Sequence, residues 1–89
     1  EPEEEKHKKN LQERIDEVCV EYKLTPREKE FIELIYSGKS NKEIAEILFL
    51  SESTVKTHIY NIFRKMNVKS RVGVIYIVNE ENEDELPRH

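Results

Sequence analysis

Two capping boxes in the middle of the chain determine where its helices can begin. Thr25 is followed three residues later by Glu28, and Ser40 is followed at the same spacing by Glu43. In such a box the hydroxyl accepts a hydrogen bond from an N–H of the first turn, and the carboxylate reaches back to the N–H of the capping residue. Gly38 stands just before the second box, where it supplies a left-handed helix stop. The pattern therefore predicts short helices joined by tight turns.

Apolar spacing extends this prediction along the rest of the chain. One stripe of an amphipathic helix is formed early in the sequence by Leu11, Ile15, Val18, Cys19 and Tyr22. Because free cysteine behaves as a small hydrophobic residue, we expect the thiol to be buried and structural. After this first helix, the predicted helices cover residues 26–36, 41–48, 52–66 and 71–79.

Length and composition point to one small all-α domain with flanking segments. The chain has 89 residues, and its 2 glycines and 3 prolines are too few for an all-β fold with many tight turns. We expect a four-helix helix-turn-helix domain over residues 24–79. A linker helix with a frayed, disordered start precedes it over residues 1–23, and a disordered acidic tail follows over residues 80–89. The single cysteine excludes an intrachain disulfide framework.

The break between the second and third of the domain helices is only a few residues long. Phe49 and Leu50 follow the predicted helix 41–48, and Ser51 then offers another N-cap for the helix 52–66. Two helices joined by so short a turn must cross at a steep angle, as they do in a helix-turn-helix.

The helix 52–66 has two chemically different faces at 100° per residue. The apolar face consists of Val55, Ile59, Ile62, Phe63 and Met66. The outer face consists of Ser53, Lys56, Thr57, Tyr60, Asn61 and Arg64. An ordinary solvated face usually mixes Glu with Lys, whereas this one has no acid. A row of cationic and hydrogen-bonding groups suits a major groove flanked by phosphates.

Net charge alone argues against a nucleic-acid partner, but its distribution does not. The formal charge is −4, yet residues 37–71 carry seven basic and three acidic residues between two acidic segments. The acidic flanks keep two alternatives open. The scaffold could be a protein-docking or dimerisation module that does not read DNA, or the first helix or the tail could cover the basic face.

The last predicted helix conflicts with local propensity. Its β-branched content, from Val72 to Val78, favours a strand, but an isolated strand in a helical domain would have no partner. We therefore predict a helix that is apolar on all sides. A surface helix needs only one apolar stripe, so we expect the surplus, namely Val74, Ile77 and Val78, to form a dimer interface.

Ordered motifs over residues 24–79 resemble the LuxR-type helix-turn-helix domain, also called FixJ/NarL-type, of bacterial transcription regulators. The matching strings are Leu24-Thr25-Pro26-Arg27-Glu28, Asn41-Lys42-Glu43-Ile44-Ala45, Leu50-Ser51, Thr54-Val55-Lys56-Thr57-His58, Lys65-Met66-Asn67-Val68 and Ser70-Arg71. The resemblance implies a DNA-binding output domain that dimerises through its last helix. Double-stranded DNA and a second copy are therefore the expected partners, and RNA polymerase is a further candidate.

The resemblance also assigns roles to individual residues. It implies that Lys56, Thr57 and Tyr60 face bases. Phosphate contacts are expected from Lys42, Ser53, Thr54, Arg64, Lys69 and Arg71. Two positions depart from the family pattern. Gly73 stands where a better helix former is usual and should weaken the last helix by about 1 kcal/mol, whereas Asn67 replaces a glycine and still tolerates a left-handed stop.

Other kinds of site are not predicted. The three histidines are far apart without metal-ligand spacing, and there is no Gly-rich phosphate loop, nucleophile elbow or paired-carboxylate constellation of the catalytic kind. We therefore expect no enzyme activity, cofactor, metal or small-molecule site in this chain. His58, beside the apolar face, should pack rather than read a base. The expected location is cytoplasmic, which includes the cytoplasmic end of a membrane sensor. The target promoter and the sign of regulation do not follow from these residues.

Overall fold

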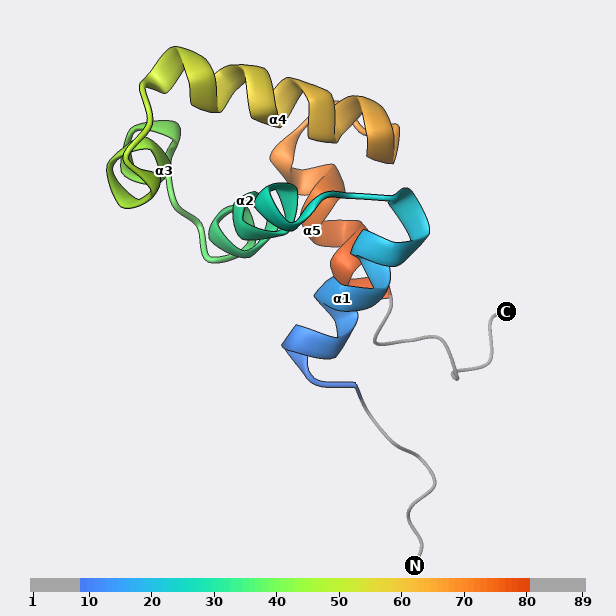
Figure 1. The fold of residues 1–89 in the computed structure, drawn as a ribbon. Helices are drawn as coiled ribbons and strands as arrows, with labels where there is room; N and C mark the ends of the chain where they lie inside the picture. Colours follow the sequence, from blue (N-terminus) through green and yellow to red (C-terminus); the bar gives the residue numbers. More distant parts are fainter. Residues whose placement is uncertain (1–8, 81–89) are drawn as a thin grey trace, which may run out of the picture.

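A computed structural model describes residues 9–80 as five helices (Figure 1). These are α1 (Leu11–Tyr22), α2 (Pro26–Tyr36), α3 (Asn41–Leu48), α4 (Glu52–Met66) and α5 (Arg71–Glu80). The all-α prediction is confirmed, and so are the bounds of α2, α3 and α4. Glu80 ends α5 and so does not belong to a tail. The predicted disorder of the first residues, and of the acidic residues after Glu80, lies outside the described residues.

Both predicted capping boxes are formed. The N–H of Glu28 donates to the Thr25 hydroxyl over 3.1 Å, and Glu28 accepts from the Thr25 N–H over 2.8 Å. Ser40 and Glu43 repeat the arrangement with the same two distances. Gly38 has a φ of 87° and ends α2 in the left-handed region, as predicted. The starts of α2 and α3 are therefore fixed by residues that are neighbours in the sequence.

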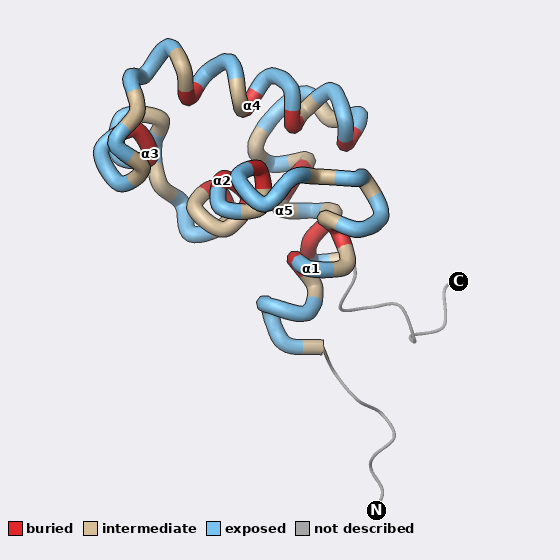
Figure 2. The backbone as a smooth tube through the Cα atoms, viewed as in Figure 1, coloured by how far each residue is buried: buried red, intermediate tan, exposed pale blue. Residues whose placement is uncertain are grey.

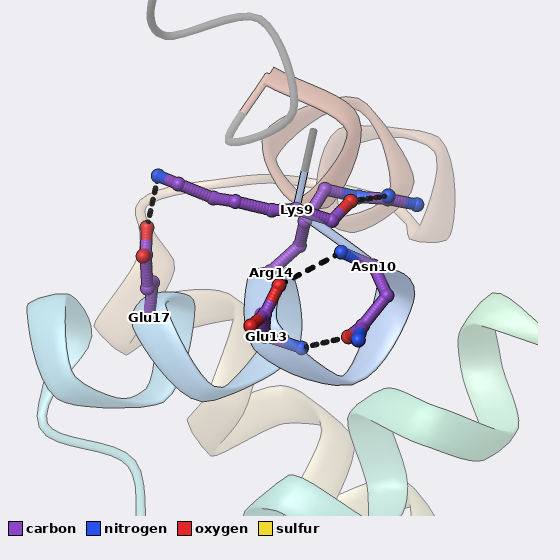
Figure 3. Close-up of polar contacts among 5 residues, drawn as sticks. All are labelled: Lys9, Asn10, Glu13, Arg14 and Glu17. Carbon is purple, nitrogen blue, oxygen red and sulfur yellow. Dashed lines mark hydrogen bonds and ion pairs between the residues drawn. The ribbon is translucent and has the colours of Figure 1, made fainter. Parts of the chain in front are cut away.

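A third capping box, which the sequence analysis did not identify, begins α1 (Figure 3). Asn10 accepts from the N–H of Glu13 over 2.8 Å, and Glu13 accepts from the N–H of Asn10 over 3.0 Å. Two longer side chains brace the same end of the helix. Lys9 pairs with Glu17 over 2.6 Å, and Arg14 donates to the Lys9 carbonyl over 3.0 Å. Helix α1 thus begins at a defined residue.

The five helices pack around one core (Figure 1). Helix α4 runs along one side of the domain, and α3 crosses beneath its N-terminal end at a steep angle, as the short turn predicted. Helix α5 leads from the other end of α4 back to α1, and it packs against both α1 and α2. Helix α1 therefore lies on the side of the domain away from α4.

The core takes buried residues from all five helices, and the buried positions of α4 all lie on the side that faces the other helices (Figure 2). The buried residues of α4 are Val55, Ile59, Ile62 and Met66, with Phe63 half-buried. Residues of α2 and α3 belong to the same cluster, with Phe31, Ile35 and Ile44 buried and Leu48 half-buried. The predicted core face of α4 is confirmed.

Helix α5 requires a correction. Val74 and Val78 are fully buried in the core of the protomer, so they are not surplus apolar residues on its surface. The prediction assumed that only one stripe of this helix is covered, but α1 and α2 both pack against α5. Ile77 is half-buried against the core. The exposed large hydrophobic residues of this helix are Val72, at 73%, and Tyr76, at 62%.

Gly73 has a packing role that the sequence analysis did not identify. A Cβ atom at this position would lie 2.8 Å from Cβ of Val68 and 2.9 Å from its Cγ1. Separations this short force the neighbouring atoms to shift, and Val68 precedes α5 on a short turn that gives it little freedom. Glycine therefore lets the first turn of α5 approach the end of α4 closely, at the expense of helix propensity.

Candidate nucleic-acid interface

The outer face of α4 is exposed along its length. Lys56, Thr57 and Tyr60, the predicted base contacts, all project away from the core, because the buried residues of α4 occupy the opposite side. Ser53, Asn61 and Arg64 are exposed on the same face. These six residues, which we call the reading face, include no acid.

A hydroxyl network fixes the N-terminal turn of α4. The Ser51 hydroxyl accepts from the N–H of Thr54 over 3.1 Å and donates to the Thr54 hydroxyl over 2.9 Å. It also lies 3.3 Å from the Ser53 hydroxyl. The half-buried Thr54 is therefore held by the cap, and Ser53 is the more exposed of the two predicted phosphate contacts in this turn. The first N–H groups of α4 lie beside both hydroxyls, which favours an anion.

Thr57 has a defined hydroxyl orientation. Its Oγ1 donates to the Ser53 carbonyl over 3.1 Å. Because the proton is committed to the backbone, the exposed side chain presents oxygen lone pairs and a methyl group. Thr57 can therefore accept a hydrogen bond from a base amino group or contact a thymine methyl group.

Two residues near the C-terminal end of the reading face interact with each other. The guanidinium of Arg64 lies over the ring of Tyr60, with its central carbon 5.8 Å from the ring centroid. Both side chains are exposed, so the contact orients a cation at the surface of the domain.

Arg71 lies at the start of α5, as predicted, and also has a structural role that was not predicted. Its guanidinium donates to the Lys39 carbonyl over 2.8 Å and to Oδ1 of Asn41 over 2.5 Å, and thereby ties the start of α5 to the turn between α2 and α3. A guanidinium has five N–H donors, so others remain for a phosphate. The residue is nevertheless a structural tie first, which sequence spacing could not show. Lys42 is exposed in the first turn of α3, and Lys69 is exposed two residues before α5 begins.

Lys65 lies beside the reading face but is paired within the chain. Its ammonium is 2.8 Å from Oε1 of Glu28, which is only 7% exposed. Burial alone would raise the pKa of the Glu28 carboxyl, but hydrogen bonds from Lys65 and from the Thr25 N–H outweigh it and hold the pKa below its ordinary value. The pair joins α2 to α4 and neutralises the charge of Glu28 beside Asn61 and Arg64 of the reading face.

A shallow polar pocket lies next to this ion pair, lined by Glu28, Asn61, Arg64 and Lys65. Asn61 belongs to the predicted outer face but was not among the predicted DNA contacts. Its place in the sequence, between Tyr60 and the basic residues Arg64 and Lys65, could have indicated that it belongs to the site. The amide and guanidinium donors of the pocket extend the reading face towards α2.

His58 packs, as predicted, because its ring lies 4.8 Å from that of Phe31. Among residues 9–80, no group of three His, Cys, Asp or Glu side chains is placed to hold a metal ion. Within the same residues, each helix is too short or too polar to cross a membrane.

Helices α3 and α4 cross at a steep angle, and the exposed polar face of α4 has no acid. This arrangement defines a helix-turn-helix domain of the DNA-binding class. Residues 22–78 match the model of the bacterial regulatory proteins of the luxR family. The chain belongs to this family, which confirms the resemblance drawn from residues 24–79.

The relatives that this chain resembles are regulatory proteins by name. The CsgBAC operon transcriptional regulatory protein of Escherichia coli (strain K12) is 51% identical over 57 residues, which are 64% of this chain and 26% of that protein. The nitrate/nitrite response regulator protein NarL of the same strain is 47% identical over 58 residues, or 65% of this chain and 27% of NarL. The uncharacterized transcriptional regulatory protein YhcZ of Bacillus subtilis (strain 168) is 56% identical over 50 residues, which are 56% of this chain and 23% of YhcZ. The chain thus spans about a quarter of each relative.

Proposed function

We propose that this domain binds double-stranded DNA sequence-specifically in the major groove, as the output domain of a bacterial transcription regulator. The observation that carries the proposal is the exposed, acid-free reading face on the second helix of a helix-turn-helix. A rigid helix supported from behind by a packed core fits the major groove, which admits one α-helix.

Within this proposal, the reading face divides into two kinds of contact. Lys56, Thr57 and Tyr60 read base edges, the lysine as a donor and the threonine as an acceptor or through its methyl group. Phosphates are held by Lys42, Ser53, Thr54, Arg64, Lys69 and Arg71. Such contacts set the register of the helix in the groove and make the affinity dependent on salt.

We also propose that two copies bind adjacent half-sites through α5, with a contact surface different from the predicted one. Val72 and Tyr76 replace Val74 and Val78 as its centre, because they are the exposed large hydrophobic residues of the helix. Half-sites about one helical turn apart would then be read by the two copies of α4. A regulator of this type acts in the cytoplasm, where bacterial DNA lies, and RNA polymerase is its expected protein partner.

Selection from random duplexes tests the central proposal. The chain should enrich a defined sequence, and its affinity for that sequence should fall steeply as salt rises, whereas a scrambled duplex should bind much more weakly. Lys23, exposed at the end of α1, provides a control, since Lys23→Ala should change neither affinity. If no sequence is enriched and the chain binds none of the duplexes, the result would favour the protein-docking alternative.

A further inference from the structure

Both ends of α5 are tied to the region where α2 gives way to α3. The Tyr36 hydroxyl, at the end of α2, donates to Oδ1 of Asn79 in the last turn of α5 over 2.6 Å. Arg71, the first residue of α5, donates to the Lys39 carbonyl over 2.8 Å and to Oδ1 of Asn41 over 2.5 Å. We call these three hydrogen bonds the α5 ties. They join residues that are 30 to 43 positions apart, so they hold α5 in place from a distant part of the chain.

The α5 ties matter because of the two helices that they relate. Helix α4, which carries the reading face, packs against α2 and α3, whereas α5, the proposed dimer helix, packs against α1 and α2 (Figure 1). Helix α2 therefore lies between the helix proposed to read DNA and the helix proposed to pair two copies. Asn41 is the first residue of α3, so the tie from Arg71 attaches the dimer helix directly to the helix-turn-helix.

The start of α5 also rests on the turn that follows α4. Gly73 lies so close to Val68 that a Cβ atom at the glycine would be 2.8 Å from Cβ of the valine. The N–H of Val68 in turn donates to the Phe63 carbonyl over 3.0 Å, which attaches the valine to the last turn of α4. This contact fixes where α5 begins, and the tie from Tyr36 to Asn79 fixes where it ends. A helix that is fixed at both ends has a fixed direction relative to α4.

The direction of α5 bears on which DNA two paired copies can bind. Half-sites one helical turn apart are separated by about 34 Å, so each reading helix would lie about 17 Å from the two-fold axis. A tilt of about 10° in each copy would move its reading helix by about 3 Å, and the rise per base pair is about 3.4 Å. A small change at α5 is therefore enough to alter the spacing of the half-sites by about one base pair or more.

We propose that the α5 ties determine which half-site spacing the paired domains accept, an inference that rests on the proposed function. Tyr36, Asn41 and Asn79 are positioning residues in this role, because they act through the direction of α5 and need contact no base. A freely tilting α5 would let the two reading faces adjust to several spacings. With α5 fixed, a site of the wrong spacing can be bound only if the DNA bends or twists, which costs free energy. The chain would thus select its DNA site by distance as well as by base sequence.

The test uses the 89-residue chain and duplexes that carry two copies of its selected half-site, with centre-to-centre spacings from about 8 to 13 base pairs. Cooperativity is measured at each spacing as the ratio of two-site to one-site affinity. Tyr36→Phe removes the hydroxyl but keeps the ring, which packs against the core. Asn41→Ala removes one acceptor of Arg71 and leaves the guanidinium in place. The two substitutions are compared singly and together.

Ser37→Ala is the matched control, because the Ser37 hydroxyl donates to the Glu33 carbonyl of α2. Its loss removes a hydrogen bond close to the α5 ties without releasing α5. One-site affinity should be the same in all variants, since the reading face is unchanged. Thermal unfolding checks that each variant is folded at the temperature of the binding assay. If the double variant is not folded there, the two single variants are compared in the same way.

The wild type should bind cooperatively at one preferred spacing. The double variant should lose about threefold or more of that cooperativity and gain cooperativity at neighbouring spacings. A merely structural role would lower stability but leave the preferred spacing unchanged. An unchanged spacing profile in the folded variants, or a wild type that binds single half-sites but prefers no spacing, would overturn the inference alone. A wild type that selects no sequence at all would instead overturn the proposed function.

Discussion

Arg64 lies over the aromatic ring of Tyr60, one helical turn earlier on α4, with 5.8 Å between its central guanidinium carbon and the ring centroid. The ring of Tyr60 thus orients a cation on the reading face. The hydroxyl of the same exposed side chain is not part of this contact. Tyr60 has two separable functions in the proposed interface. The ring positions Arg64 for a phosphate, and the hydroxyl is available to a base.

Substitution of Tyr60 should separate these two functions. Tyr60→Phe keeps the ring under Arg64, so affinity for a scrambled duplex should remain, while discrimination in favour of the selected duplex falls. Tyr60→Ala should lower affinity for both duplexes, by about 0.5–1 kcal/mol from the lost cation–π contact at an exposed site. A double-mutant cycle with Arg64→Ala measures the coupling. Zero coupling would show that the contact has no role in binding.

Lys56 should contribute to specificity without contributing to stability. It is exposed on the reading face, so Lys56→Ala should leave the unfolding free energy unchanged. If the ammonium donates to a base, the substitution should remove about 1–3 kcal/mol of discrimination between selected and scrambled duplexes. Fluorescence anisotropy with both duplexes measures this difference. Equal losses on the two would reassign Lys56 to the phosphate backbone.

Arg71 should behave differently, because it is a structural tie as well as a proposed phosphate contact. Arg71→Ala leaves the Lys39 carbonyl and the Asn41 side chain without their donor and should lower the unfolding free energy by about 1–3 kcal/mol. Under conditions where the variant is folded, affinity should fall equally on both duplexes, with a salt slope smaller by about one unit. Chemical denaturation and a salt titration report the two effects separately. An unchanged salt slope would leave only the structural role.

Gly73 allows helix propensity and packing to be tested against each other. Propensity alone predicts that Gly73→Ala stabilises the domain by about 1 kcal/mol. The overlap with Val68 predicts the opposite, and we expect a net loss of about 1–2 kcal/mol. Val72→Ala, at the exposed neighbouring position, is the control that reports propensity without the overlap. A higher melting temperature for Gly73→Ala would contradict the packing role.

The Glu28–Lys65 pair should make stability depend on pH in the acid range. The pKa of Glu28 is lowered in the folded state from an ordinary value of 4.5, so its contribution is present above that pH and is lost as pH falls through the folded pKa. Denaturation of the wild type between pH 6 and pH 3 should therefore show a steeper loss of stability than denaturation of Glu28→Gln. Lys65→Ala should likewise make the unfolding free energy depend less steeply on pH in this range. Parallel profiles for wild type and Glu28→Gln would rule out this linkage.

Local rules predicted most of the fold. The capping residues and the spacing of the apolar residues predicted the first residues of α2, α3 and α4 correctly, because each of these patterns involves residues close together in the chain. The same holds for the core face of α4, since a single amphipathic helix reveals its buried side. The Asn10–Glu13 box was not predicted, although Asn is as favourable an N-cap as Ser and the spacing to Glu13 is the same as in the other two boxes.

Long-range packing was the part that sequence patterns could not supply. The burial of Val74 and Val78 depends on α1 covering a second side of α5, and the tie from Arg71 joins residues that are 30 and 32 positions apart. Phe49 was recognised as apolar, but its exposure depends on a left-handed backbone that only the structure shows. The reading face was placed correctly on the helix, whereas the roles of its residues stay predictions.

The three capping boxes also bear on how the domain reaches its native state. Each box joins residues three positions apart, so the starts of α1, α2 and α3 are specified before any distant contact forms. Little chain entropy is lost in closing loops of this size. Helical domains dominated by such near-neighbour contacts fold in microseconds to milliseconds. After a transient unfolding event, the apolar core of this domain should therefore be sheltered again quickly, with little time for proteolysis or aggregation.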